Sequence, residues 1–136
     1  MRNKKVKAVI AAMAISAMTT VTAFAATRTV TAPTITYSSI DYGQEIQITG
    51  QMTSSTAEYL AVTQYATYSN RGSSTLTTGP KTTTESNGAA TSVTGSCTYT
   101  LMNGDHKSYV MAYNEGYFKV PGYQDYILCE TKSTKF

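Results

Sequence analysis

The sequence predicts an all-β protein, a small antiparallel β-sandwich or small barrel of about seven or eight short strands. Thr, Tyr, Val and Ile, which favour strands, dominate the chain after residue 25, whereas Ala and Leu are sparse there. That part shows no hydrophobic periodicity of about 3.6 residues, the pattern of an amphipathic helix. Gly, Pro, Asn and Ser recur at short intervals instead, as expected for turns between short strands.

The first 25 residues have the three parts of a secretory signal peptide, which we expect to be helical and to be cleaved. Four basic side chains lie in residues 1–7, and an uncharged Ala-rich run covers residues 8–22. Ala23-Phe24-Ala25 ends the segment with small residues at both recognition positions. We therefore predict cleavage between Ala25 and Ala26, which leaves residues 26–136 as one secreted, extracellular domain.

A retained membrane anchor is the alternative for this segment. Residues 8–26 are uncharged over 19 positions, close to the ~20 that span a bilayer. Ala and Thr dominate them, so insertion into a bilayer is only weakly favourable. We favour cleavage, after which the sequence predicts no membrane span.

Much of the basic character of the chain lies in the predicted signal peptide. The whole sequence has a net charge of +3 and a pI near 8.8, from 11 basic and 8 acidic residues. Four of the basic residues precede residue 8, so residues 26–136 keep seven against eight acids, a net charge of −1. Those seven are scattered and form no stripe that would neutralise phosphates, which argues against a nucleic-acid partner.

Four strands are expected in the N-terminal half of the domain, at residues 28–31, 34–37, 45–52 and 58–69. Pro33 separates the first two, because proline lacks the N–H that a strand ladder requires. In the third, alternation places Ile46, Ile48 and Gly50 on one face. The fourth has large apolar side chains on both faces, which predicts a central or covered strand.

The second half of the domain is expected to form an edge hairpin and then a meander. Residues 69–92 consist mainly of small and polar residues, and Gly79-Pro80 suits a turn, so we predict a solvated hairpin there, with an irregular loop as the alternative. Four strands then pair in chain order, at residues 93–102, 107–113, 117–120 and 123–130. Alternation along the first of them places Val93, Cys97, Tyr99 and Leu101 inward. Turns are expected at residues 103–106, at residues 114–116 and at Pro121-Gly122.

Cys97 and Cys129 are the only cysteines, and both lie in predicted strands of an exported chain. An even pair in a small secreted domain favours a disulfide. Closing a loop of about 33 residues would contribute about 3.7 kcal/mol to stability. In a meander the two strands are not neighbours, so the bond would have to join two sheets or close a barrel. Two buried free thiols are the alternative.

The sequence offers few side chains for catalysis or metal binding. His106 is the single histidine and lies beside Asp105 in a predicted turn. No G-x-S-x-G sequence is present to hold a nucleophile, the acids show no D-x-D series for calcium, and no cluster has the spacing of metal ligands. We therefore expect neither enzymatic activity nor a cofactor or metal.

Six aromatic residues, five of them tyrosines, lie within residues 109–126. They either fill the core, since aliphatic residues are few, or form an exposed platform for a sugar or a peptide. Strand alternation predicts that Tyr109, Met111 and Tyr113 share one face. The candidate binding residues are Tyr109, Tyr113, Tyr117, Tyr123 and Tyr126.

These observations favour a secreted, non-catalytic binding or interaction module of bacterial type, at the cell surface or in the medium. Its partner is expected to be a glycan or a protein. The alternatives are a small secreted antagonist of the bacteriocin kind, whose size and export fit, and a small secreted hydrolase that uses His106.

Secretion makes the first testable prediction. The protein recovered from the medium of an expressing bacterium should begin at Ala26, as measured by intact mass and N-terminal sequencing. Ala25→Arg should block processing, because the position before the cleaved bond accepts only small residues. Wild-type protein in the medium that still contains residues 1–25 would contradict the prediction.

Overall fold

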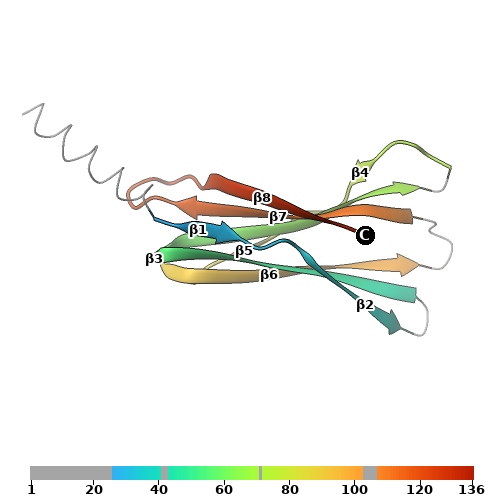
Figure 1. Ribbon diagram of the computed structural model, residues 1–136, viewed down its shortest axis with the longest axis horizontal. Helices are drawn as coiled ribbons and strands as arrows, with labels where there is room; N and C mark the ends of the chain where they lie inside the picture. The colour runs from blue at the N-terminus through green and yellow to red at the C-terminus, as the bar shows by residue number, and fades with distance from the viewer. Residues whose placement is uncertain (1–25, 41–42, 71, 103–106) are drawn as a thin grey trace, which may run out of the picture.

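The computed structural model describes residues 26–40, 43–70, 72–102 and 107–136 (Figure 1). Within these ranges the chain forms eight β-strands and no helix, and every strand pair is antiparallel. The predicted all-β antiparallel fold is confirmed. No helix in the described ranges could cross a membrane. The predicted signal peptide, Asp105 and His106 lie outside the described residues.

A single long strand, β3 (Gly43–Asn70), is the centre of two sheets. Its first half has a partner strand on each side, since Ile48 lies opposite both Ile35 and Cys97. This first sheet has β6 (Ala90–Met102) along one edge. Its other edge is β1 (Arg28–Val30) followed by β2 (Thr34–Ile40). The break between them falls at Pro33, as predicted.

The second half of β3 is the centre of the second sheet in the same way. Val62 lies opposite both Thr84 and Gly116. One edge consists of β4 (Thr77–Thr78) and β5 (Thr82–Glu85). On the other side lies β7 (Lys107–Lys119), which pairs in turn with β8 (Ile127–Lys135). The two sheets pack face to face as a curled sandwich that is continuous through β3 (Figure 1).

An ion pair stabilises the place where β3 changes sheet, between Thr53 and Glu58. Glu58 is only 5% exposed and accepts hydrogen bonds from Ser54 Oγ at 2.8 Å and from Arg28 at 2.6 and 2.9 Å. The Arg28 guanidinium also lies 3.6 Å from the centre of the Phe118 ring. A buried carboxylate requires such partners, so this contact fixes β1 and β7 against the bend.

The described residues form two apolar core clusters, one toward each end of the sandwich. The first holds Val30, Met52, Leu60, Val62, Val93, Phe118 and Val120. The second holds Ile46, Ile48, Ala66, Cys97 and Ala112, against which Tyr99, Tyr109 and Phe136 pack. The predicted inward faces of residues 45–52 and of residues 93–99 are therefore confirmed, and the strand at residues 58–69 is central, as its two apolar faces predicted.

Two amide side chains lie between these clusters. Gln64 and Asn114 are neighbours across the β3–β7 pairing, and both are fully buried. They face two glycines of the first sheet, Gly50 and Gly95, which are neighbours across the β3–β6 pairing. A Cβ on Gly50 would overlap the Asn114 amide, and one on Gly95 would lie 2.5 Å from Gln64 Oε1. The glycines thus leave the space that the amides fill.

The predicted C-terminal meander is wrong. The strand at residues 93–102 pairs with β3 in the first sheet, whereas β7 lies in the second, so the two do not form a hairpin. Residues 114–116 lie in the middle of β7 instead of forming a turn, because Asn114 donates a hydrogen bond to Thr31 O at 2.9 Å and Gly116 makes room for Val30. The turn at Pro121-Gly122 is found, with Gly122 at φ 87° and Tyr123 N donating to Val120 O.

The segment at residues 69–92 lies at an edge of the second sheet, but it does not fold back at Gly79-Pro80. Both β4 and β5 pair with β3, so the glycine and proline interrupt one edge strand. Gly79 N donates to Ala66 O at 2.8 Å, and Tyr99 Oη donates to Pro80 O at 2.6 Å. The phenol of Tyr99 therefore closes the gap that the interruption leaves.

Cys97 and Cys129 are free thiols, so the predicted disulfide does not form in the structure. Cys97 belongs to the second cluster on β6, and Cys129 packs against the first cluster from β8. The two strands lie at opposite edges of the sandwich. At one edge β6 of the first sheet lies next to β5 of the second, and at the other edge β8 of the second sheet lies next to β1 of the first. The alternative of two thiols that pack as small hydrophobes describes them. Burial raises the pKa of the Cys97 thiol to about 11, which keeps it protonated.

The glycine–amide contact makes a stability prediction. Gly50→Ala should lower the free energy of unfolding by about 1–3 kcal/mol, because its methyl group overlaps the Asn114 side chain. Urea unfolding measures the loss. In an Asn114→Ala background the same substitution should cost less, since the overlapping amide is gone. Thr49→Ala, whose side chain faces away from the core, is the control, and equal costs of Gly50→Ala in the two backgrounds would refute the prediction.

Candidate functional site

The outer face of the second sheet carries tyrosines from both β3 and β7. Alternation along β3 places Tyr59, Ala61, Thr63 and Tyr65 on that face. The paired residues on β7 are Lys119, Tyr117, Glu115 and Tyr113. Tyr65 and Tyr113 stack with their ring centres 4.8 Å apart and their planes 11° apart.

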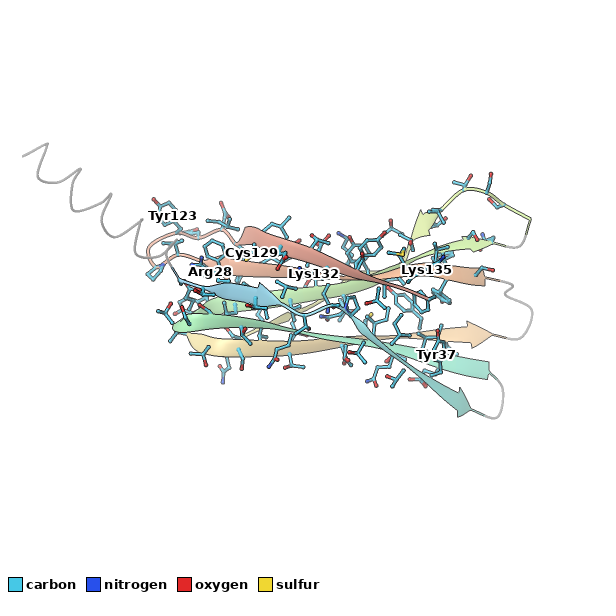
Figure 2. All side chains as sticks on the ribbon, in the orientation of Figure 1. Arg28, Tyr37, Tyr123, Cys129, Lys132 and Lys135 are labelled. Atoms are coloured by element: carbon cyan, nitrogen blue, oxygen red, sulfur yellow. The ribbon has the colours of Figure 1, made fainter. Side chains whose placement is uncertain are left out.

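The predicted binding tyrosines divide among three places. Tyr113, Tyr117 and Tyr126 are half-buried on or beside this outer face. Tyr109 packs into the second core cluster, because a register shift between Thr67 and Tyr68 moves it to the opposite face from Tyr113. The predicted common face for Tyr109, Met111 and Tyr113 is therefore wrong. Tyr123 lies in the turn before β8 and is 61% exposed (Figure 2).

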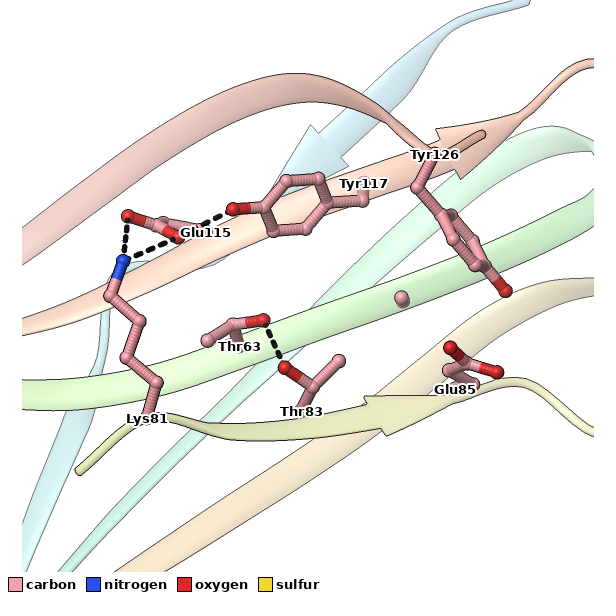
Figure 3. A pocket seen from close by; sticks show the side chains of 8 residues that line it. Thr63, Lys81, Thr83, Glu85, Glu115, Tyr117 and Tyr126 are labelled. Atoms are coloured by element: carbon pink, nitrogen blue, oxygen red, sulfur yellow. Dashed lines mark hydrogen bonds and ion pairs between the residues drawn. The ribbon is translucent and has the colours of Figure 1, made fainter. Parts of the chain in front are cut away.

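A groove of about 240 Å³ runs over the middle of this face (Figure 3). Its floor is formed by the small side chains of Ala61 and Thr63 on β3, and taller side chains stand on both sides. It is lined by Ala61, Thr63, Lys81, Thr83, Glu85, Glu115, Tyr117 and Tyr126. Of these residues, only Tyr117 and Tyr126 are among the five tyrosines that the sequence predicts as binding residues.

Glu115 organises one end of the groove. Its carboxylate accepts hydrogen bonds from Tyr117 Oη at 2.5 Å and from Tyr65 Oη at 2.8 Å. Lys81 Nζ lies 3.2 and 3.3 Å from the two carboxylate oxygens, and 4.3 Å from the centre of the Tyr65 ring. Lys81 and Glu115 are 34 positions apart in the sequence, so only the fold brings them together.

These contacts set the ionisation of the site. Burial acts to raise the pKa of the Glu115 carboxyl, but the hydrogen bonds from Tyr117, Tyr65 and Lys81 outweigh it and lower that pKa. Burial, together with the hydrogen bond to Glu115, raises the pKa of Tyr117 to about 12 and also raises that of Tyr65. At neutral pH, Glu115 is thus an ionised acceptor held by two protonated phenols and one ammonium.

The other end of the groove has fewer hydrogen bonds and ion pairs between its side chains. Thr63 and Thr83 share a hydrogen bond of 2.7 Å between their hydroxyls. Figure 3 shows the Glu85 carboxylate near the hydroxyl end of Tyr126, and burial together with the charge of Glu85 raises the pKa of that hydroxyl. In the described ranges, no hydrogen bond or ion pair involves the Glu85 side chain. Lys119 Nζ lies over two rings that flank this end, 4.7 Å from the centre of Tyr59 and 5.2 Å from that of Tyr126.

The groove has the chemistry of a binding site for a polar ligand with an apolar side. It offers ring faces, hydroxyl groups and one unpaired carboxylate. No group of three or more possible metal ligands occurs in the part of the chain that the structure describes. Tyr113, Glu115 and Tyr117 alternate along the sequence, which is the pattern of one strand face, but the turn predicted at residues 114–116 would separate them.

No protein-family model matches this chain, and it matches no curated protein.

The Glu115 network predicts a pH-dependent contribution to stability. Glu115→Gln should lower the free energy of unfolding by about 1–3 kcal/mol at neutral pH, because three donors lose a charged acceptor. Since the folded pKa is lowered, this contribution is present above the ordinary glutamate pKa and is lost as the pH falls through the folded value.

Urea unfolding at a series of pH values measures this contribution. The difference between wild type and Glu115→Gln should therefore shrink in acid. Glu130→Gln is the control, because Glu130 pairs with the exposed Lys132 and should contribute little at any pH. A difference that does not change with pH would rule out this role for Glu115.

Proposed function

We propose that this protein is an exported, non-catalytic binding module whose groove on the outer face of the second sheet holds part of a glycan. The observation that supports this most directly is the floor of Ala61 and Thr63 between the Tyr117 and Tyr126 rings and the polar groups of Lys81, Thr83, Glu85 and Glu115. Export is proposed from the signal-peptide pattern of residues 1–25.

The size of the groove favours a segment of a polymer over a whole small molecule. Sites that enclose a drug-sized ligand have volumes of about 300–1,000 Å³, and this groove has about 240 Å³. It lies on the outer face of a sheet, with neighbouring strands on both sides of its floor. A chain that places one of its units in the groove and continues over the sheet fits this shape.

The chemistry of the lining suits a sugar ring. Tyrosine rings offer flat apolar area with little conformational freedom to lose. Sugar hydroxyls both donate and accept hydrogen bonds, which matches the threonine hydroxyls and the carboxylate around the floor. Tyr117 and Lys81 are already held by Glu115, so binding would cost little further ordering of these side chains.

The state of Glu115 argues against the hydrolase alternative at this site. A glycosidase needs a carboxyl group with a raised pKa to protonate the leaving group. Glu115 is held in its charged form by three donors, and its pKa is lowered. Its hydrogen bonds therefore suit a structural acceptor better than a proton donor.

Binding to a glycan array and to cell-envelope polysaccharide tests the proposal. Tyr117→Ala and Tyr126→Ala should each weaken saturable binding by about tenfold, since each removes an aromatic contact. Tyr37→Ala is the matched control, because Tyr37 lies on β2 of the other sheet and is 54% exposed (Figure 2). Tyr123→Ala should also have little effect, since Tyr123 does not line the groove.

Circular dichroism of each variant shows whether it folds. Absence of saturable binding by the wild type to any of these glycans would exclude the proposal, and so would an equal loss in Tyr37→Ala.

A further inference from the structure

On the outer face of the second sheet, a carboxylate and an aromatic ring together bind one ammonium group, that of Lys81. Lys81 Nζ lies within 3.3 Å of both Glu115 carboxylate oxygens and 4.3 Å from the centre of the Tyr65 ring. A carboxylate supplies a charged hydrogen-bond acceptor, and the face of an aromatic ring attracts a cation through its quadrupole. Together the two groups bind the chain's own lysine.

The opposite end of the groove also has a carboxylate and a tyrosine, Glu85 and Tyr126, and no ammonium group among the described residues pairs with that carboxylate. Both residues line the groove there, with the Glu85 carboxylate near the Tyr126 hydroxyl (Figure 3), and burial together with the charge of Glu85 raises the pKa of that hydroxyl. Lys119 reaches the Tyr126 ring at 5.2 Å, but it makes no ion pair with Glu85. Glu85 is thus the carboxylate of the lining that lacks a cation, whereas Glu115 has Lys81.

We propose that the glycan carries a protonated amine, as in a glucosamine-type sugar, and that Glu85 and Tyr126 bind this ammonium group. The inference rests on the proposed function of the same groove. An ammonium gains from both groups, whereas a neutral hydroxyl gains only the hydrogen bond to the carboxylate. The charged residues of the lining are Lys81, Glu85 and Glu115, a net charge of −1, so a cationic unit also neutralises the groove.

The test compares two oligosaccharides of equal length, one of glucosamine and one of N-acetylglucosamine, which differ in whether the nitrogen is charged. Calorimetric titration of the purified protein at mildly acidic pH, where the amine is protonated, measures both affinities. We expect the glucosamine oligomer to bind about tenfold more tightly, from one ion pair and one cation–π contact.

Two variants of equal charge assign the preference to Glu85. Glu85→Gln should weaken binding of the glucosamine oligomer by about fivefold to tenfold and leave that of the acetylated oligomer within about twofold. Glu45→Gln is the matched control, because it removes the same charge from the outer face of the first sheet and should preserve the preference. Glu85 is exposed, so its replacement should not disturb folding.

Equal affinity for the two oligomers, or loss of the preference in Glu45→Gln as well, would overturn the inference and leave glycan binding intact. The inference also fails if the glucosamine oligomer does not bind while another glycan does. Absence of binding to every glycan would overturn the proposed function as well. Only a preference for the amine that depends on Glu85 supports the inference.

Discussion

The whole structure depends on β3 being the central strand of both sheets. Among the strands that the structure describes, all others except β8 pair with β3, and β8 pairs with β7. Because strands pair only along their edges, one strand can be central in two sheets only if it leaves the first sheet and enters the second. The bend near Glu58 does this, and the buried contacts of Glu58 with Arg28 and Ser54 satisfy its charge there.

The relative position of the two sheets follows from the contact between the buried amides and the glycines. Apolar side chains tolerate small shifts against one another, whereas the Gln64–Asn114 pair fits only opposite residues that lack a Cβ. Gly50 and Gly95 are such residues and lie side by side in the first sheet. Gly116 accommodates Val30 from the first sheet in the same manner. These contacts fix how one sheet is positioned along the other, whereas the two apolar clusters on either side of them would allow small shifts.

The candidate site depends on the same strand, seen from its other side. The inner face of β3 carries Leu60, Val62 and Gln64, and its outer face carries Ala61, Thr63 and Tyr65. The strand that forms the groove floor is hydrogen-bonded to β5 on one side and to β7 on the other. The groups around it come from β5, from β7 and from the turn before β8, and Lys81 joins Glu115 across the sheet. A small floor between tall neighbours makes the groove.

The sequence by itself determined the all-β class, the inward faces at residues 45–52 and 93–99, the break at Pro33, the turn at Pro121-Gly122 and the two-faced strand at residues 58–69. Each follows from local chemistry, because side chains alternate along a strand and proline lacks an N–H.

Only the tertiary structure decided that β6 pairs with β3, that Asn114 and Gly116 lie inside β7, and that a register shift turns Tyr109 inward. Those outcomes, like the meeting of Lys81 with Glu115 and the separation of Cys97 from Cys129, depend on which distant segments lie opposite one another. Alternation assigns a residue to a face, but it does not identify the partner strand or reveal an extra residue that reverses the faces.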